Sequence, residues 1–181
     1  MQDIYIILSF SGTLFSKFLK AISELTYPHV SISLHEDIRV AYSFGRKIVR
    51  NPLIGGFVEE HQNKGVYAVF DSDCKILKLT ITDEQYNKLL TIIEKFKSNS
   101  KVYKYNYMGL VYTYFNRPQN LRHRFTCTQF VATVLKESGI ADFGKPASLV
   151  RSDEYNYIPG VKLIYKGKFN AYKVNNLMLL T

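Results

Sequence analysis

The stretch RFTCTQFVATVLKESGI (residues 124–140) reads as a helix that carries a cysteine in its first turn. Thr126 and Gln129 have the spacing of a capping box, which makes Thr126 the N-cap and Cys127 the first helical residue. Gly139 is placed to end the helix. The apolar stripe after the cysteine consists of Phe130, Val131, Val134 and Leu135. The pattern predicts an amphipathic helix with a thiol at its open end.

The position of Cys127 is compatible with two interpretations. Free cysteine is among the most buried residue types and often only fills space. At a helix N-terminus, however, unpaired N–H groups and the helix dipole lower a thiol pKa and stabilise an oxyanion. Arg122, His123 and Arg124 directly precede Cys127 and add positive charge. The nucleophile interpretation therefore depends on finding a base.

His29 is the best candidate for that base. It opens the stretch HVSISL (residues 29–34), whose alternation puts His29, Ser31 and Ser33 on one face of a strand and apolar residues on the other. His35 belongs to a turn, His61 lies in a loop-like segment, and His123 is too close to Cys127 in sequence to face it across a fold.

The remaining pattern predicts an α+β fold with an antiparallel sheet, built as a single domain over residues 1–181. We expect helices at residues 13–25, 82–97 and 107–115, and a short one within 146–155. We expect strands at residues 3–9, 39–44, 161–167 and 169–174, and two strands around the turn DSD within 65–81. Residues 51–57 read as a loop because they contain Pro52 and Gly55-Gly56.

Composition excludes several classes of protein. With 46% hydrophobic residues, 14 Tyr and 12 Phe, the chain has the material for a core and does not resemble a disordered segment. No secretory signal or membrane span is visible, so we expect a cytoplasmic protein with both cysteines as free thiols. No CxxC, HxxxH or phosphate-binding loop is present, so we expect neither a metal nor a cofactor.

The net charge of +9 is concentrated in one part of the chain. Residues 95–135 contain seven Lys and Arg and no Asp or Glu. Such a run fits an anionic partner, such as nucleic acid or acidic lipid, a carboxylate-bearing substrate, or an ordinary solvated face. The segment KVYKYNYMGLVYTYF interleaves Lys and Tyr, but the absence of a known nucleic-acid-binding motif disfavours nucleic acid and leaves an anionic surface open.

Three stretches taken together resemble the circularly permuted NlpC-type papain-fold hydrolases, a group related to the lecithin:retinol acyltransferase-like enzymes. They are LTYPHVSISL, RVAYSFGRK and FTCTQFVATVLKESGI, and the resemblance extends over residues 3–140. In this permuted group the histidine strand precedes the cysteine helix, which is the order of His29 and Cys127.

The resemblance implies a papain-like domain in which Cys127 is the nucleophile and His29 the general base. A third residue on the strand after the histidine strand normally orients the imidazole through a Glu, His, Asn or Gln. That strand, RVAYSFG, offers Ser43 and Tyr42 instead, so these two become the candidates.

The implied activity is that of a cysteine hydrolase of the amidase, peptidase or thioesterase type, by hydrolysis or acyl transfer. Arg46 and Lys47 follow near the expected mouth of the site, where they would bind the carboxylate of a small peptide-like substrate. Thr126, at the head of the cysteine helix, is a further substrate-binding candidate. The alternative is a domain that binds nucleic acid or an anionic membrane and keeps a degenerate, non-catalytic site.

Overall fold

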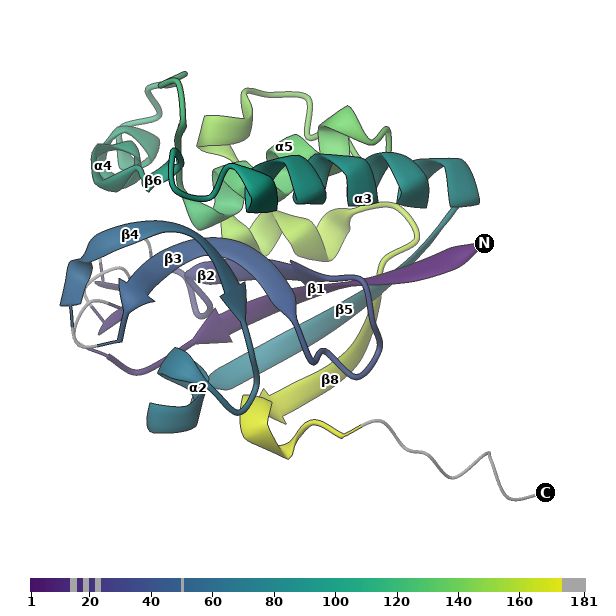
Figure 1. Cartoon of the computed structure of the whole chain (residues 1–181), viewed down its shortest axis with the longest axis horizontal. Helices are drawn as coiled ribbons and strands as arrows, with labels where there is room; N and C mark the ends of the chain where they lie inside the picture. Colours follow the sequence, from purple (N-terminus) through teal and green to yellow (C-terminus); the bar gives the residue numbers. More distant parts are fainter. Residues whose placement is uncertain (14–15, 18–19, 22–23, 50, 174–181) are drawn as a thin grey trace.

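The computed structural model describes residues 1–13, 16–17, 20–21, 24–49 and 51–173. Within them, eight strands form one sheet in the order β7-β6-β4-β3-β2-β1-β5-β8, and the α+β class is confirmed (Figure 1). The strands are β1 (Gln2–Phe10), β2 (His29–Ser33), β3 (Ala41–Ile48), β4 (Asn51–Glu60), β5 (Asp73–Ile81), β6 (Lys104–Tyr105), β7 (Arg124–Phe125) and β8 (Lys162–Lys168). All neighbours pair antiparallel except the short pair β6–β7, which is parallel.

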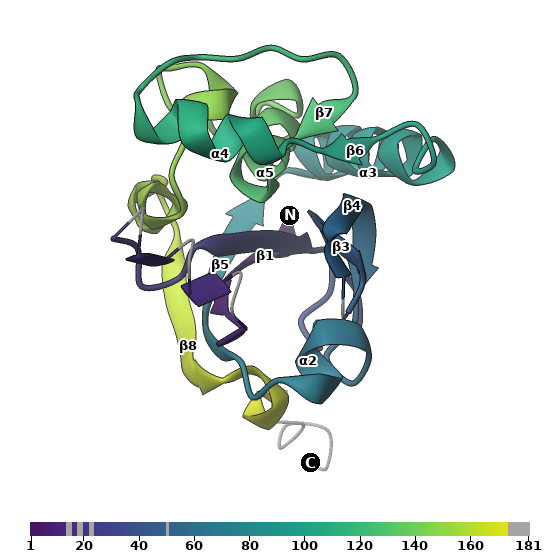
Figure 2. The same ribbon diagram turned by 90° about the vertical axis from the view of Figure 1, so that its left-hand side faces the viewer.

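Helices lie on both sides of the sheet. The longer ones, α3 (Asp83–Ser98) and α5 (Cys127–Glu137), cover one face, and α4 (Tyr107–Tyr114) lies beside them. The sheet curls away from this layer, and α2 (Gly65–Val69) lies on its opposite side (Figure 2). Short 3₁₀ turns complete the chain: η1 (Ala147–Leu149), η2 (Ser152–Tyr157) and η3 (Phe169–Ala171).

The central strands β1 and β2 are buried on both faces, as the apolar run of β1 predicts. Ile4, Ile6 and Leu8 pack with α3 and α5 in the main core, whereas Tyr5 and Ile7 face the second core on the α2 side. Their partners across the β1–β2 pair are the serines of β2, so the predicted polar face of β2 is enclosed by the curled sheet. His29 pairs with Ser9 at the end of this row.

The Cys127 helix is confirmed, and an aromatic cluster holds it against the sheet. The ring of Phe130 from α5 lies 5.3 Å from that of Phe44 on β3 and 5.0 Å from that of Phe96 on α3. The Thr126 side chain accepts a hydrogen bond from the backbone N–H of Gln129, as expected of the N-cap. The reciprocal half of the capping box is absent, since the amide oxygen of Gln129 is buried without a hydrogen-bond partner.

The loop prediction for residues 51–57 is wrong, because this segment forms most of β4. Its glycines permit a close approach between neighbouring chains rather than a turn. A Cβ at Gly55 would lie 2.7 Å from the Tyr107 hydroxyl, and one at Gly56 would lie 2.5 Å from the carbonyl oxygen of Tyr103. A glycine pair inside a strand can therefore mark crowding by an adjacent segment.

Two further strand predictions are wrong. Residues 65–69 form helix α2, because Tyr67 turns inward to pack its ring 4.5 Å from that of Phe169 and to hydrogen-bond Ser9. The predicted strand at 169–174 is instead the 3₁₀ turn η3, in which Phe169 contributes to the same cluster. Val174 lies outside the described residues. Apolar alternation marked both segments correctly as inward-facing, but it did not distinguish short helix from strand.

The helix expected at residues 13–25 falls partly outside the described residues, which omit 14–15, 18–19 and 22–23. Residues 16–17 and 20–21 are helical. The helices at 82–97 and 107–115 are confirmed as α3 and α4, and α3 has the predicted capping box of Thr82 and Gln85. In the part of the chain that the structure describes, no helix is long and apolar enough to cross a membrane.

Gly56→Ala is expected to destabilise the protein by about 1–3 kcal/mol, the usual cost of forcing extra volume into a packed site. The added methyl group would meet a backbone carbonyl, which cannot move away without disturbing the β4–β6 pair. Gly45→Ala is the control, because a Cβ there meets its nearest atoms at 3.4 Å. Urea unfolding measures both variants, and equal midpoints would contradict the role assigned to Gly56.

Candidate active site

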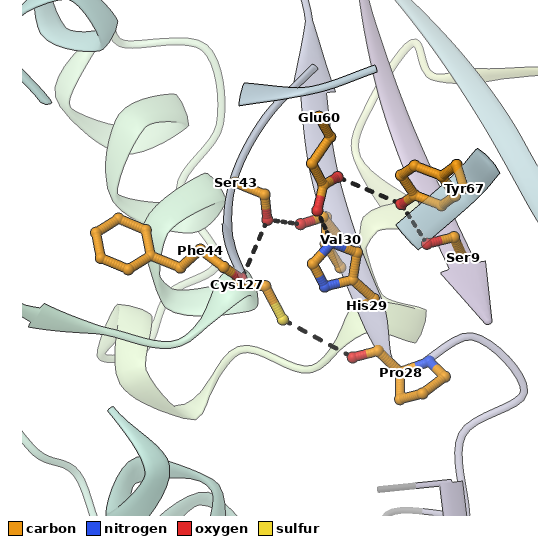
Figure 3. Close-up of polar contacts among 9 residues, drawn as sticks. All are labelled: Ser9, Pro28, His29, Val30, Ser43, Phe44, Glu60, Tyr67 and Cys127. Carbon is orange, nitrogen blue, oxygen red and sulfur yellow. Dashed lines mark hydrogen bonds and ion pairs between the residues drawn. The ribbon is translucent and has the colours of Figure 1, made fainter. Parts of the chain in front are cut away.

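The first turn of α5 brings Cys127 against the beginning of β2. The side chain is buried, with 2% of the residue exposed, and its sulfur lies 3.9 Å from the carbonyl oxygen of Pro28. His29 follows Pro28 directly, and its ring interacts with the Cys127 thiol closely enough to shift the pKa of both groups. The two residues that the sequence analysis paired across almost a hundred positions are therefore neighbours (Figure 3).

Glu60, the last residue of β4, binds the other side of the His29 ring. Its Oε1 lies 2.8 Å from His29 Nε2. A carboxylate only accepts hydrogen bonds, so Nε2 carries a proton and Nδ1 is left to serve the thiol. Cys127, His29 and Glu60 thus form a continuous chain from α5 through β2 to β4.

The carboxylate of Glu60 is itself held in place. The Tyr67 hydroxyl, from α2, donates to Glu60 Oε2 at 3.3 Å and lies 2.9 Å from the Ser9 hydroxyl of β1. Since the Tyr67 proton is directed to Glu60, the Ser9 hydroxyl donates to Tyr67. Both Ser9 and Tyr67 are buried, which fixes the carboxylate and, through it, the imidazole (Figure 3).

Charge and hydrogen bonding favour an ionised Cys127–His29 pair. Burial works to raise the pKa of the Cys127 thiol, but the hydrogen bond and charge of His29, with backbone hydrogen bonds from Val30 and Thr128, bring that pKa below its ordinary value. Burial works to lower the pKa of His29, yet the charge of Glu60 and the interaction with Cys127 raise that pKa well above its ordinary value. Both directions favour thiolate and imidazolium.

Tyr105 of β6 is a further site residue that sequence reasoning missed. Its side chain is buried, and its phenol interacts with the Cys127 thiol. Burial, followed by the charge of Cys127, raises the pKa of this phenol well above its ordinary value, so the hydroxyl keeps its proton. A protonated donor beside the sulfur stabilises a thiolate, or negative charge that develops next to it.

Neither sequence candidate for the third member contacts the His29 ring. Ser43 is fully buried and donates its hydroxyl hydrogen to the Val30 carbonyl at 2.6 Å, which ties β3 to β2. Tyr42 points to the helix-covered core, where its ring stacks on that of Phe57. Glu60 replaces both as the residue that orients the imidazole.

Glu60 was missed because the segment before it was assigned to a loop. The sequence FVEE, at residues 57–60, carries the needed signal: an aromatic residue that faces the core, followed by carboxylates at the end of the strand. Tyr67 and Tyr105 carry no comparable signal, because their contacts depend on how α2 and β6 approach the site.

Arg46 and Lys47 lie where the sequence analysis expected them, in the wall of a cavity that His29 also lines. We call this the basic cavity; its volume is about 210 Å³ and its wall includes His29, Arg46, Lys47, Lys64, Tyr105 and Tyr107. Arg46 is half-buried and donates to the Thr13 hydroxyl at 2.7 Å and to the Val49 carbonyl. Burial lowers the pKa of Arg46, a sign that its charge is partly removed from water.

Thr126 lines a second, smaller hollow on the other side of Cys127. We call this the apolar cleft; its volume is about 80 Å³, and Cys127 lines it together with Leu25, Pro28, Leu110, Tyr114 and Val150. The Thr126 hydroxyl is occupied as the helix cap, accepting from the backbone N–H of Gln129 at 3.1 Å. Its direct role is therefore to set the start of α5.

Among the described residues, no group of three or more His, Cys, Asp or Glu side chains could hold a metal ion. No protein-family model and no curated protein matches the chain. The Cys127–His29–Glu60 chain and the hollows around it therefore carry the functional interpretation.

Proposed function

We propose that the chain is a cysteine hydrolase with the circularly permuted, papain-like arrangement of the NlpC type. Cys127 is its nucleophile, His29 its general base and acid, and Glu60 the residue that orients His29. The observation that carries the proposal is the row Cys127–His29–Glu60, in which Glu60 hydrogen-bonds the imidazole and the imidazole interacts with a thiol at the N-terminus of a facing helix.

The geometry supports acyl transfer in two steps. The Cys127 thiolate attacks the carbonyl carbon of an amide or ester, a C–S bond forms, and the first turn of α5 with Tyr105 supplies donors for negative charge. The C–N or C–O bond then breaks, and the imidazolium gives its proton to the leaving atom. Water, deprotonated by His29, attacks the thioester and releases the acid, and the thiolate–imidazolium pair is restored.

The substrate class follows from the wall of the site. A small peptide-like molecule with a carboxylate fits, because Arg46 and Lys47 line the basic cavity and neither is ion-paired with a described acidic residue. A guanidinium in this position binds a carboxylate through two parallel hydrogen bonds.

The two cysteines provide an internal test. Iodoacetamide is expected to label Cys127 at neutral pH faster than free cysteine, since each unit by which a thiol pKa is lowered gives up to about tenfold more thiolate. Cys74 is the matched control, because it is equally buried and burial raises its pKa to about 12. Mass spectrometry of peptides after timed labelling measures both. Equal labelling of the two cysteines would remove the basis for the proposal.

A second candidate function rests on the surface around α4. Met108, Val111, Tyr114 and Phe115 are large apolar residues that are between 44% and 64% exposed. Exposed cations flank them, none ion-paired with a described acidic residue: Lys101, Lys104, Arg117, Arg122 and Arg124. Met108 and Val111 cannot stack on bases, whereas all four apolar side chains can enter a lipid surface, so this surface fits an anionic membrane better than a nucleic acid.

Vesicle sedimentation tests this second function. The protein is expected to sediment with vesicles that contain an anionic phospholipid and to remain in solution with purely neutral vesicles. The double variant Met108→Ser/Phe115→Ser should lose sedimentation, whereas Cys127→Ala should keep it. Binding to a labelled oligonucleotide without binding to vesicles would refute the membrane assignment.

A further inference from the structure

Helix α2 is too short to hold its own position. It has five residues (Gly65–Val69), and the side chain of its N-cap residue, Lys64, makes no capping hydrogen bond. Isolated helices shorter than about 12 residues are marginal in water, so contacts with other parts of the chain must fix α2. These contacts matter to the site because Tyr67, the buried residue of α2, donates to Glu60.

The segment after β8 supplies such contacts, from 103 to 110 positions further along the chain. The side-chain amide of Asn170, in η3, donates to the Tyr67 carbonyl at 2.8 Å. The amide of Gln62, just before α2, donates to the carbonyls of Phe169 at 2.6 Å and Tyr172 at 2.8 Å. We call these two side-chain amides the α2 clamp. Helix α2 and η3, the yellow turn after β8, are neighbours in Figure 1 and Figure 2.

The η3 side of the clamp is itself anchored to the fold. The backbone N–H of Phe169 donates to the Ser72 carbonyl at 2.8 Å, and the Tyr172 hydroxyl donates to the Glu36 carbonyl at 3.0 Å. Both aromatic side chains are buried in the second core. The clamp therefore ties α2 to a fixed part of the structure.

The contact that the clamp supports has little reserve. The Tyr67 hydroxyl lies 3.3 Å from Glu60 Oε2, beyond the usual range of about 2.5–3.0 Å for a hydrogen bond between oxygens. The same hydroxyl lies only 2.9 Å from the Ser9 hydroxyl, which remains a partner if α2 shifts. A small displacement of α2 would thus leave Glu60 Oε2 without its donor.

The carboxylate of Glu60 has competing partners of its own. Its side chain is 14% exposed and lines the basic cavity together with the cations Arg46, Lys47 and Lys64. A carboxylate oxygen that loses its donor in a largely buried position turns toward water or a cation, because an unsatisfied acceptor is costly. The Tyr67 hydroxyl therefore keeps the carboxylate beside the imidazole and away from the cavity.

We infer that Gln62 and Asn170 are positioning residues for the reaction of Cys127. They fix α2 so that Tyr67 holds the Glu60 carboxylate on the His29 ring. Neither side chain lines the basic cavity, so both act through Tyr67 and not on a substrate. This inference rests on the proposed function, in which His29 activates Cys127.

Timed labelling with iodoacetamide tests the clamp in the full chain. Gln62→Ala and Asn170→Ala are each expected to slow the labelling of Cys127 about threefold at mildly acidic pH. This is the change in thiolate fraction that follows from a rise of half a unit in the pKa of the thiol. The pKa of the His29 ring, followed by nuclear magnetic resonance, should fall in both variants, because the carboxylate no longer faces the ring.

Two other amides provide matched controls. The Asn99 side chain donates to the Lys95 carbonyl at 2.9 Å, and the Gln85 side chain donates to the Gly139 carbonyl at 2.6 Å. Asn99→Ala and Gln85→Ala remove the same kind of hydrogen bond without touching α2, so both should label at the wild-type rate. Urea unfolding of the clamp and control variants shows whether a loss of reactivity merely follows a loss of stability.

Tyr67→Phe tests whether the clamp acts through the hydroxyl. This variant keeps the ring that packs 4.5 Å from that of Phe169 and removes only the donor to Glu60, so it should slow labelling at least as much as either clamp variant. Adding Asn170→Ala to Tyr67→Phe should then change the rate little, because the contact through which the clamp acts is already absent.

The outcomes separate this inference from the proposed function. Wild-type labelling and an unchanged His29 titration in both clamp variants would refute the clamp and leave the hydrolase intact. Effects that multiply in the double variant, or equal losses in the two control variants, would refute the clamp as well. Labelling of wild-type Cys127 no faster than that of Cys74 would instead refute the hydrolase itself.

Discussion

His29→Ala is expected to slow the alkylation of Cys127 at neutral pH by about 100-fold or more. His29 provides the hydrogen bond and the charge that bring the pKa of the thiol below its ordinary value. Without the imidazole, burial becomes the leading influence and raises that pKa, as it does for Cys74. Each unit by which a thiol pKa exceeds the pH reduces the thiolate fraction about tenfold. Timed labelling with iodoacetamide and peptide mass spectrometry measure the change.

The dependence on pH should change in a defined direction. In the wild-type protein the pKa of Cys127 is lowered and that of His29 is raised, and both directions favour the ion pair at neutral and mildly acidic pH. The labelling rate should therefore stay high as the pH falls below neutrality and decline only when the thiolate is protonated. In His29→Ala the rate should instead keep rising into the alkaline range, and thiolate absorbance should follow the same curve.

His61→Ala is the matched control for the loss of an imidazole. His61 also lines the basic cavity, but its ring hydrogen-bonds the Arg39 carbonyl and not Cys127. This variant should label at the wild-type rate over the whole pH range. If both variants lost reactivity equally, the cause would be damage to the cavity, and the assignment of His29 as the base would be wrong.

The sequence was informative where local chemistry determines structure. Thr126 caps α5 because a threonine before a helical run can accept from the N–H three positions on, and this spacing placed Cys127 at the helix head. The alternation of β2 separated His29 from Val30 and Ile32, whose burial in the main core is confirmed. Cysteine and histidine could be identified because each belongs to an element with a strong periodic pattern.

The rest of the site depends on contacts that no local pattern encodes. Glu60 was missed because Gly55-Gly56 reads as a turn, whereas these glycines accommodate Tyr103, Tyr105 and Tyr107 beside the strand. Ser43 has the right residue type and the right strand, but its hydroxyl bonds the Val30 carbonyl across the β2–β3 pair. Residue type and strand order therefore directed the third-member prediction to β3, whereas the partner of His29 is Glu60 of β4, which the register of the two strands places opposite Ala41.

Glu60→Gln is expected to reduce the reactivity of Cys127 at least about tenfold below neutral pH. A rise of one unit in the pKa of the thiol reduces its thiolate fraction about tenfold, which corresponds to about 1.4 kcal/mol. The amide keeps the shape of the carboxylate but removes its charge, the largest of the influences that raise the pKa of His29. A less basic imidazole is less often protonated, so the thiolate loses its counter-ion and the pKa of Cys127 rises.

Glu59→Gln is the control because Glu59 is the adjacent residue and its carboxylate pairs with Lys97 instead. Titration of the His29 ring by nuclear magnetic resonance provides a readout that a structural effect alone would not move. Its pKa should fall in Glu60→Gln and remain unchanged in Glu59→Gln.

The network around Glu60 sharpens this expectation. The Tyr67 hydroxyl donates to one carboxylate oxygen while His29 occupies the other. A glutamine must turn its oxygen to one neighbour and its amide hydrogens to the other, so either Tyr67 accepts from the amide and donates to Ser9, or the amide faces His29. If the oxygen turns to Tyr67, the amide faces Nε2 and forces the neutral ring into the tautomer whose Nδ1–H can no longer accept a proton from the thiol. Unchanged titration and unchanged reactivity would show that Glu60 is a neighbour of His29 without being its partner.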